Sequence, residues 1–430
     1  MQKFILNFAL LGGLVAPLCA AAAPAALVTN GLDAGSGSLR AALESGATRV
    51  IIKPEVSNIV LETPLTYDGT EPLRIFGSDQ VISWSSALPT AVPSTVPSGG
   101  DGPLLHVSKG ANLYVSRLAF EGPGGYSIEN QGGGKGIFVE VPEDRQGQVK
   151  VQLRAVSISN TGNHGLHIRD CNDDACGAGQ GAAGTGSPAS MILRLTDVHV
   201  DGVGFGKQDA DGVRVDDRGD GDILLVATNS TFSNVGGDGI ELDEGDEGTV
   251  KVNVRNSQFD SNGAYCFDYD GDGPFDPISV DPACNDDGDP DVDDAFDIDE
   301  AGGGGIEGII RNVEVVDNYD EGLDFDSAGE GPGNFVDLRV IKILASGNAD
   351  EGIKVSEEGD ASVLVSMRFI DAEGDVEVEE EGNGDLEVIL KNSVIGDDLK
   401  LSEKDDGIGT AKLRWTVVGD ELDFDNVDEI

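Results

Sequence analysis

Apolar and acidic residues alternate in a short motif that recurs along the chain. Its copies read ADGVRVDD (210–217), GDGIELDE (237–244), DEGLDFDS (320–327), DEGIKVSE (350–357), GDVEVEE (374–380), GDDLKLSE (396–403) and GDELDFD (419–425). Alternation with a period of two is typical of a β-strand that buries one face. The motif therefore predicts a series of equivalent short strands.

The copies are evenly spaced. If the first apolar residue of each copy is its anchor, Val213, Ile240 and Phe267 lie 27 residues apart, and the last anchors follow at intervals of 23. Each unit also carries a second alternating run, such as TVKVNVRNSQF at 249–259. Units of this length are typical of stacked repeats, and they are too rich in glycine and asparagine for a helix between the strands. The pattern predicts an all-β fold, a solenoid in which each unit forms one coil of a parallel β-helix.

Two smaller features fit this fold. Asn229, Asn256 and Asn312 each precede an anchor by 11 residues, so stacked coils would place their side chains above one another in a bend. Near the start, a short amphipathic capping helix is expected from about Ser38 to Glu44. Such a helix would cover the apolar end of the first coil.

The N-terminal segment carries a family resemblance. GSGSLRAAL (35–43) is similar to the GxGSLRxA segment of large bacterial surface β-helix proteins of the polymorphic outer-membrane type. The repeat region as a whole, about residues 26–426, resembles the pectate-lyase-like right-handed parallel β-helix superfamily. The resemblance implies a right-handed solenoid, and its motifs identify the fold rather than a substrate.

The charge of the chain limits its partners. Lys and Arg number 28 against 79 Asp and Glu, which gives a formal net charge of −51. Phosphate recognition needs clustered Lys and Arg, so nucleic acid is excluded as a direct partner. Acidity of this size indicates divalent cations, a cationic partner or saline surroundings.

Residues 1–23 are expected to be a secretory signal peptide. Lys3 is followed by the apolar run FILNFALLGGLV (4–15) and then by small residues. The run is too short to span a bilayer, and no transmembrane segment is predicted elsewhere. We therefore expect a single β-helix domain over residues 24–430 that is secreted, at the cell surface or periplasmic.

The mature chain would keep four cysteines, which in a secreted protein predict two disulfides. They are Cys171, Cys176, Cys266 and Cys284. Proximity favours Cys171–Cys176 and Cys266–Cys284, although three pairings are formally open. The first pair would bracket a Gly/Ala-rich loop at 171–189.

An Asp-rich insertion at 268–295 is the most specific site signal. Asp268, Asp270, Asp272 and Asp276 match positions 1, 3, 5 and 9 of a calcium loop, with Ser279 where the bidentate Glu would stand. The segment resembles the calcium-wrapped repeats of thrombospondin type 3. A second cluster would consist of Asp286, Asp287, Asp289, Asp291 and Asp293. The alternative is a solvated acidic loop tied at its base by a disulfide.

Alternation also predicts which residues point outward. One outward column would contain His167, Arg214, Glu241, Asp268, Asp297, Asp324, Lys354, Glu377, Lys400 and Asp423, and the next Arg169, Asp216, Asp243, Asp270, Asp299, Asp326, Ser356, Glu379, Ser402 and Asp425. Coils about 4.8 Å apart would make exposed carboxylates repel by about 1 kcal/mol per pair. Calcium shared between coils would relieve this, with Asp216, Asp243, Asp299 and Asp326 as ligands. Diffuse counterions are the alternative.

The chain around GNHGLHIRDCNDDAC (162–176) is where catalysis would be sought. The superfamily resemblance implies cleavage of acidic polysaccharides with calcium and an Arg or Lys base, which here would be Arg169 or Arg214, with His167 beside them. No motif of one enzyme family is visible, and the net charge would repel a polyanion. The hypothesis from sequence is therefore a secreted calcium-binding scaffold or surface-associated binding protein. The alternative is a calcium-dependent polysaccharide lyase or a related carbohydrate-active enzyme.

Overall fold

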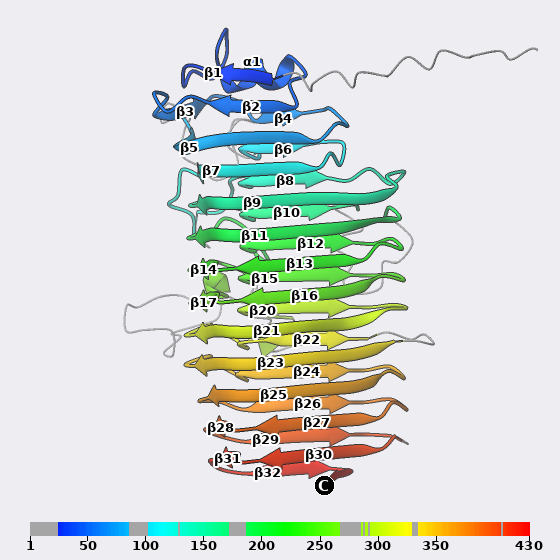
Figure 1. The fold of residues 1–430 in the computed structure, drawn as a ribbon. Helices are drawn as coiled ribbons and strands as arrows, with labels where there is room; N and C mark the ends of the chain where they lie inside the picture. The colour runs from blue at the N-terminus through cyan, green and yellow to red at the C-terminus, as the bar shows by residue number, and fades with distance from the viewer. Residues whose placement is uncertain are drawn as a thin grey trace, which may run out of the picture.

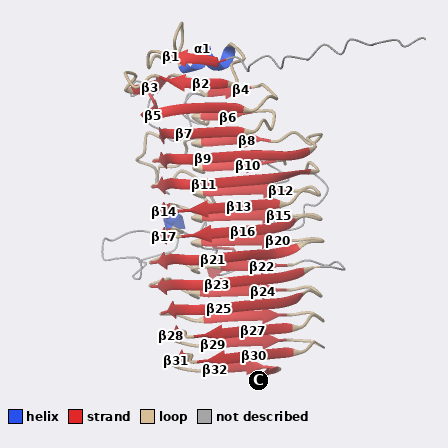
Figure 2. Ribbon diagram, viewed as in Figure 1, coloured by secondary structure: helices blue, strands red, loops and turns tan. Residues whose placement is uncertain are grey.

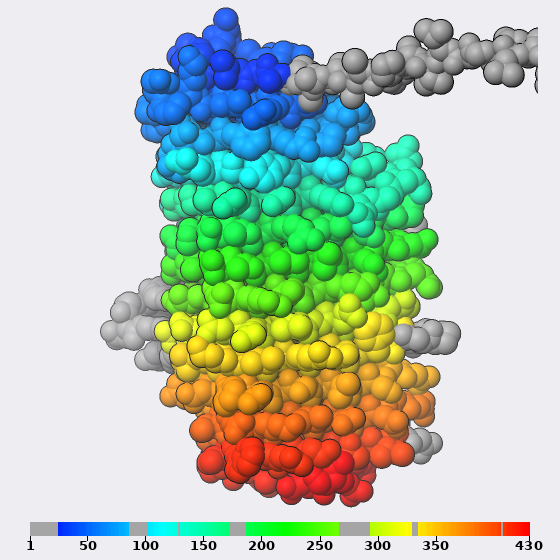
Figure 3. Space-filling model, in the orientation of Figure 1, coloured from blue at the N-terminus to red at the C-terminus, as the bar shows by residue number. Residues whose placement is uncertain are grey.

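The chain folds into a right-handed parallel β-helix, as predicted (Figure 1). The computed structural model describes residues 25–85, 102–127, 130–171, 186–266, 285–286, 289–290, 293–328, 334–405 and 407–430. Nearly all of its regular structure is strand (Figure 2), and the coils stack from the N-terminal to the C-terminal end of an elongated body (Figure 3).

The acidic motif forms one continuous parallel sheet of 12 strands, here called sheet B. Its strands are β4 (Leu65–Tyr67), β6 (Leu105–Val107), β8 (Ile137–Glu140), β10 (Leu166–Arg169), β12 (Val213–Asp217), β15 (Ile240–Glu244), β20 (Phe296–Glu300), β22 (Asp324–Ser327), β24 (Ile353–Glu357), β26 (Val376–Glu380), β29 (Leu399–Glu403) and β32 (Leu422–Asp425). Each coil adds one strand, and the strands pair in the order of the sequence.

The second alternating run of each unit forms sheet A, with 19 strands. They are β1 (Ala25–Val28), β2 (Arg49–Ile52), β3 (Asn58–Leu61), β5 (Leu73–Trp84), β7 (Leu113–Glu121), β9 (Gly147–Ser159), β11 (Ala189–Asp201), β13 (Ile223–Thr228), β14 (Thr231–Ser233), β16 (Thr249–Arg255), β17 (Gln258–Asp260), β21 (Gly305–Val316), β23 (Phe335–Ser346), β25 (Ser362–Ala372), β27 (Leu386–Lys391), β28 (Val394–Ile395), β30 (Gly409–Arg414), β31 (Val417–Val418) and β33 (Val427–Glu429).

Sheet A bends in each coil at one residue with left-handed backbone geometry. Asn229, Asn256 and Asn312 hold this position with φ of 53°, 52° and 53°, a conformation that asparagine tolerates better than most residues. Asn256 donates to Asn229 Oδ1 at 3.3 Å, and Asn312 donates to Asn256 Oδ1 at 3.0 Å. The predicted asparagine ladder is confirmed, and it marks the corner of the solenoid.

The apolar residues of both sheets point inward and fill a single core. Phe232, Phe259 and Phe296 stack along it with ring centroids 5.0 and 5.6 Å apart. Helix α1 (Leu39–Glu44) lies at the N-terminal end, buries Leu39 and Leu43, and is N-capped by Ser38, whose hydroxyl accepts from the Ala41 amide. The expected capping helix is therefore present.

The structure corrects the register around Phe267. Strand β15 pairs directly with β20, so that Ile240 lies beside Phe296 and no strand anchored at Phe267 intervenes. The intervening segment contains Pro274, Pro277 and Pro282, which lack the N–H that a ladder strand must donate. The coil therefore carries a long insertion, and the placement of Asp268 and Asp270 in the outward columns was wrong.

Parts of the insertion belong to the described residues. A 3₁₀ turn, η1 (Ala264–Cys266), precedes it, and β18 (Asn285–Asp286) pairs antiparallel with β19 (Asp289–Pro290). The predicted ligands Asp268, Asp270, Asp272, Asp276, Asp287 and Asp291 lie outside the described residues. Cys176, Cys284 and residues 1–24 also lie outside them, so the disulfide pairing and the signal peptide stay predictions.

Candidate cation site on the outer face of sheet B

The outer face of sheet B carries the acidic columns in the predicted register, apart from the insertion. Arg214 lies beside Glu241, which lies beside Asp297, and the same column continues through Asp324 and Lys354. The neighbouring column runs through Arg169, Asp216, Asp243, Asp299 and Asp326. Parallel in-register pairing thus brings carboxylates from distant parts of the sequence together.

Arg214, on β12, is the centre of a buried ion-pair network on this face. Its Nε donates to Asp216 at 2.8 Å, and a terminal nitrogen donates to Asp209 at 2.6 Å. Its carboxylate partners are Asp209, Asp211, Asp216, Glu241 and Asp243. Burial opposes the charge, but these carboxylates, Glu241 foremost, hold the pKa of Arg214 well above its ordinary value. A guanidinium that keeps its proton so firmly is a counterion and is poorly suited to act as a base.

Two histidines, His164 and His167, lie beside this network, and His167 lies on the face predicted for it. His167 Nε2 donates to Asp216 at 2.5 Å, and Lys135 Nζ donates to His167 Nδ1. The rings of His164 and His167 meet edge to face with centroids 4.5 Å apart. Burial lowers the pKa of His164 to about 4 and that of His167 well below its ordinary value, so both imidazoles are neutral near pH 7.

An aromatic and basic group continues the face toward the N-terminus. The ring of Phe138 stacks on His106 with centroids 4.9 Å apart. Lys135 Nζ lies 4.6 Å and Arg169 Cζ lies 5.0 Å from the centroid of the same ring. Stacked rings flanked by cations can bind a planar or an anionic ligand.

Three consecutive coils between β15 and β22 form what we call the nine-acid patch. It consists of Asp238, Glu241, Asp243, Asp294, Asp297, Asp299, Glu321, Asp324 and Asp326. Within the described strands of these columns, no Lys or Arg lies between Arg214 and Lys354. The patch is thus the part of the face where carboxylates of successive coils follow one another without an intervening cation.

Ligand oxygens converge at two places in the patch. One oxygen each of Asp294, Glu321 and Asp324 lie within 4.8 Å of one another, and these three side chains are buried. A second group of the same size consists of Glu241, Asp297 and Asp299. Asp324 is only 7% exposed, and among the described residues its Oδ1 has no hydrogen-bond partner. An unpartnered buried carboxylate oxygen beside two other acids is an arrangement that a bound cation would satisfy.

Backbone hydrogen bonds fix the acids that precede each strand. Asp211 Oδ1 accepts the Asp238 amide at 3.0 Å, Asp238 accepts the Asp294 amide, and Asp294 Oδ1 accepts the Glu321 amide at 2.9 Å. Each carboxylate therefore uses one oxygen to accept an amide of the next coil. The second oxygen of Asp211 is paired with His164 and Arg214, whereas the ladder leaves the second oxygens of Asp238 and Asp294 for a ligand.

Burial and mutual repulsion perturb the acids of the patch. Loss of solvent, together with repulsion from neighbouring carboxylates, raises the pKa of Asp294, Asp297 and Asp324 well above the ordinary value. The pKa of Asp238 is raised for the same reasons. Without a cation these groups would gain stability by taking up protons, which is the electrostatic property of an empty cation site.

Lysine side chains pair with the acids at the C-terminal border of the patch and in the coils that follow it. Lys354 Nζ contacts Glu321 at 3.1 Å and Asp324 at 2.9 Å. Two coils later Lys400 Nζ contacts Asp375 at 2.8 Å and Glu351 at 2.9 Å. The chain thus neutralises both ends of its acidic face with its own side chains.

The four column ligands predicted from sequence fall into two kinds. Asp216 is engaged by Arg214 and His167, and Asp243 is paired with both terminal nitrogens of Arg218. Asp243 lies in the nine-acid patch together with Asp299 and Asp326, but it is the one of these three that an arginine holds. Of the insertion ligands, Asp286 and Asp289 lie on β18 and β19, while one oxygen of Asp293 clusters with Asp211 and Asp238.

Sequence reasoning missed Asp294, a member of the ligand cluster with Glu321 and Asp324. Its signal was present, because it stands two residues before the anchor Phe296, as Asp211 and Asp238 stand before theirs. It was assigned instead to the end of the Asp-rich insertion. Arg218, fully buried beside Asp243, was missed because it lies just beyond the repeated motif.

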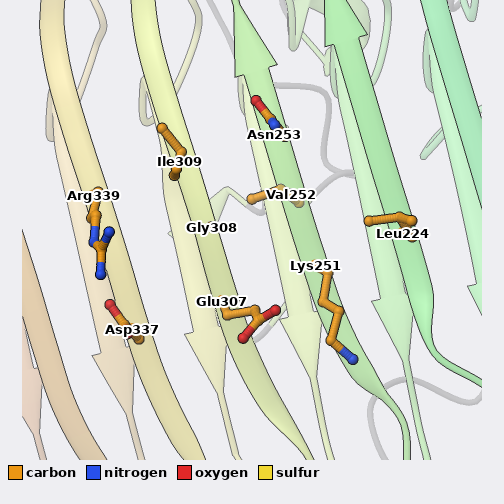
Figure 4. Close-up of a pocket in the computed structure, with 9 residues that line it drawn as sticks. All are labelled: Leu224, Lys251, Val252, Asn253, Glu307, Gly308, Ile309, Asp337 and Arg339. Carbon is orange, nitrogen blue, oxygen red and sulfur yellow. The ribbon is translucent and has the colours of Figure 1, made fainter.

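A separate shallow groove lies on the outer face of sheet A, across β13, β16, β21 and β23 (Figure 4). Leu224, Lys251, Glu307 and Asp337 form one row across it, and Asn253, Ile309 and Arg339 form the next. Charges of both signs lie together there. The groove therefore lacks the one-signed field of sheet B.

Within the described ranges, no helix is long and apolar enough to cross a membrane.

Comparison with known proteins finds only remote structural likenesses. No protein-family model matches the chain, and no curated protein matches it. The chain is similar to tailspike protein 2 from Escherichia coli O157:H7 bacteriophage CAB120, with a TM-score of 0.45 and 11% identity over 82% of this chain. It spans about 40% of the length of that tailspike. It is also similar to the catalytic unit of a thermostable GH87 alpha-1,3-glucanase from Streptomyces thermodiastaticus strain HF3-3, with a TM-score of 0.32 and 12% identity, covering 94% of this chain and 69% of that one. Likenesses of this strength do not assign an activity.

Proposed function

We propose that this chain is a secreted calcium-binding β-helix that acts as a rigid extracellular scaffold or surface-associated binding protein. Calcium would bind in the nine-acid patch and cross-link consecutive coils. The observation that carries the proposal is the convergence of Asp294, Glu321 and Asp324, with a buried unpartnered oxygen on Asp324. The signal-like residues 1–23 support secretion, and the pectate-lyase-like resemblance supports an extracellular role.

The energetics favour an ion over an empty patch. Two carboxylates about 4.8 Å apart repel by about 3 kcal/mol at an effective dielectric constant of about 20. The patch places three acids in each of its columns, so the repulsion acts several times. One divalent ion per cluster converts these repulsions into attractions and occupies the oxygens that the backbone ladder leaves free.

The chemistry of the donors favours calcium among divalent ions. Calcium accepts six to eight oxygen ligands at about 2.3–2.6 Å in irregular geometry, whereas magnesium demands a near-ideal octahedron. The described clusters offer carboxylate oxygens only, without a His or Cys that would select zinc. The Asp-rich insertion would supply further ligands of the same type.

A second candidate is the lyase-like carbohydrate enzyme, and one observation favours it. Phe138, flanked by Lys135 and Arg169, lies on the same face as the acidic patch, so a uronate could contact the basic group and a bound calcium together. Arg169 would be the base, because Arg214 is held by five carboxylates. Unsaturated product from an alginate or pectin panel, lost in Arg169→Ala, would establish this function.

Calorimetric titration with calcium tests the main proposal. We expect saturable heat at both low and high sodium chloride, and we expect Asp294→Asn combined with Asp324→Asn to remove most of it. Asp371→Asn with Glu387→Asn, on exposed positions of β25 and β27, makes the same change of charge and should leave the heat intact. Heat that vanishes in high salt, or that falls equally in both double variants, would mean diffuse counterions.

A further inference from the structure

A second file of acids lies inside the solenoid and takes no part in the cation site. The fifth residue of the sheet-B strands β24, β26 and β29 points inward, at the turn where the chain leaves the sheet. These residues are Glu357, Glu380 and Glu403, which we call the turn-acid column; they are at most 1% exposed. Glu380 and Glu403 are register partners, and the pairing of β24 with β26 places Glu357 next to Glu380.

Each acid closes its turn by accepting backbone amides. Glu380 Oε1 accepts from Gly382 at 3.0 Å and from Gly384 at 2.8 Å. Glu403 Oε1 accepts from Asp405 and Gly407, both at 3.2 Å. The carboxyl group thus replaces water inside the turn, and it must remain there for the turn amides to be satisfied.

The other oxygen of Glu380 has no such partner. Within the described ranges, Oε2 of Glu380 is buried and makes no hydrogen bond. A Cβ at Gly384 would lie 2.0 Å from the Ala361 carbonyl oxygen and 2.9 Å from Glu380 Oε1, so this turn needs glycine to pack against the neighbouring coil and the acid. A solvent-excluded carboxylate oxygen without a donor is costly, whereas protonation removes the negative charge that burial penalises.

The groups that face the column are acidic or neutral. Glu357 faces Glu300 and Glu380 of neighbouring coils, and Glu380 faces Glu403 and Asp405. Ser327 occupies the same position in β22 and donates to Glu300 Oε2 at 2.7 Å. The nearby cation, Lys404, pairs with Glu379 and Glu381 instead. The column therefore has no internal counterion among the described side chains.

We propose that the turn-acid column binds protons, so that Glu357 and Glu380 are carboxylic acids in the folded protein and the C-terminal coils loosen as pH rises. Each acid takes one proton from solvent. In Glu380 the proton resides on Oε2, while Oε1 keeps its amide bonds. None of these residues belongs to the nine-acid patch, so the inference is independent of the calcium proposal.

The direction of the effect follows from linkage. Burial, opposed only in part by the turn amides, raises the pKa of Glu357 from 4.5 to about 8 and also raises the pKa of Glu380. A folded state that binds more protons than the unfolded state loses stability with rising pH. The contribution is fully present below about pH 4.5 and is lost progressively up to about pH 8.

Hydrogen exchange of the full chain at pH 5, 7 and 9, expressed as protection factors, tests the proposal. In the wild type, the amides of β26, β27 and β29 should lose protection from pH 5 to pH 9 by at least about tenfold, the factor that corresponds to one pKa unit. Glu380→Gln keeps the acceptor and supplies a permanent donor, so it should retain protection at pH 9. Glu387→Gln, an exposed position on β27, should behave as the wild type.

Other results would overturn the proposal. One is a Glu380→Gln protein that loses protection at every pH, and another is a Glu380→Gln protein that keeps the pH dependence of the wild type. A third is loosening of these coils by a chelator at constant pH, which would mean that a metal ion occupies the column. If Glu380→Gln does not fold, the wild-type protection factors decide. Protection of β26, β27 and β29 that does not depend on pH then counts against the proposal.

Discussion

Removal of Arg214 is the most informative single perturbation of the sheet-B face. Its guanidinium lies among five carboxylates, of which Asp211 and Asp216 are completely buried, and both remain if Arg214 is replaced by methionine. Methionine fills much of the volume of the side chain and removes only its charge and donors. The variant therefore measures what the cation does for its acidic neighbours.

The expected cost follows from these contacts. At about 4 Å and an effective dielectric constant of about 20, one charge pair is worth about 4 kcal/mol, much of it offset by desolvation. Loss of one partner from a buried pair typically costs about 3 to 5 kcal/mol because the other charge is left uncompensated. We expect Arg214→Met to lower the local unfolding free energy of β12 and β15 by this amount at pH 8.

The pH dependence identifies the cause. Although burial opposes it, Arg214 and His167 hold the pKa of Asp216 well below its ordinary value of 3.8, so this carboxylate stabilises the wild type at pH 8 and at pH 4.5 alike, and its contribution is lost only at lower pH. The variant lacks that contribution, and its acids can take up protons. The difference between the variant and the wild type should therefore shrink on going from pH 8 to pH 4.5.

Native-state hydrogen exchange of β12 and β15 provides the assay, with Arg117→Met as the control. Arg117 pairs with Asp79 at 2.7 Å on the surface, with side chains 56% and 70% exposed, so solvent screens the pair and its loss should cost little stability. Equal effects of the two substitutions, or an Arg214→Met penalty that does not change between pH 8 and pH 4.5, would refute the electrostatic reasoning.

Three further outcomes are expected. Asn256→Ala places alanine at a φ of 52° and removes two hydrogen bonds of the ladder, so thermal melting should show that the free energy of unfolding falls by about 1 to 2 kcal/mol. No change would mean that the ladder does not stabilise the bend. Phe259→Ala removes the middle ring of the core stack and should cost about 3 to 5 kcal/mol in urea unfolding, whereas Phe259→Leu should cost much less. Lys354→Met frees Glu321 and Asp324 of their lysine, so calorimetry should show tighter calcium binding; weaker binding would place the ion elsewhere.

The solenoid was predictable because its signal is local and repeated. Alternation fixes which residues point inward, and the 23- and 27-residue intervals fix which strands are neighbours. Asn229, Asn256 and Asn312 even located the corner. The failure at Phe267 had the same origin, because an insertion that happens to contain an apolar–acidic pair at the repeat interval imitates a coil. Its prolines carried the opposing signal.

The candidate site was predictable only in part. The columns through Asp299 and Asp326 followed from alternation, but the roles of individual residues depend on contacts across coils that spacing does not specify. Arg214 was considered as a base, and its surroundings make it a counterion. The fifth residue of the motif, Glu357 in β24, points inward, and its carboxyl group closes the turn.

A structure determined from crystals grown in calcium-containing solution, with the ion located by its anomalous scattering, tests the central claim most directly. The account predicts a calcium peak between Asp294, Glu321 and Asp324, about 2.3–2.6 Å from a carboxylate oxygen of each. A patch without such a peak, in crystals where calcium is bound elsewhere or not at all, would contradict it.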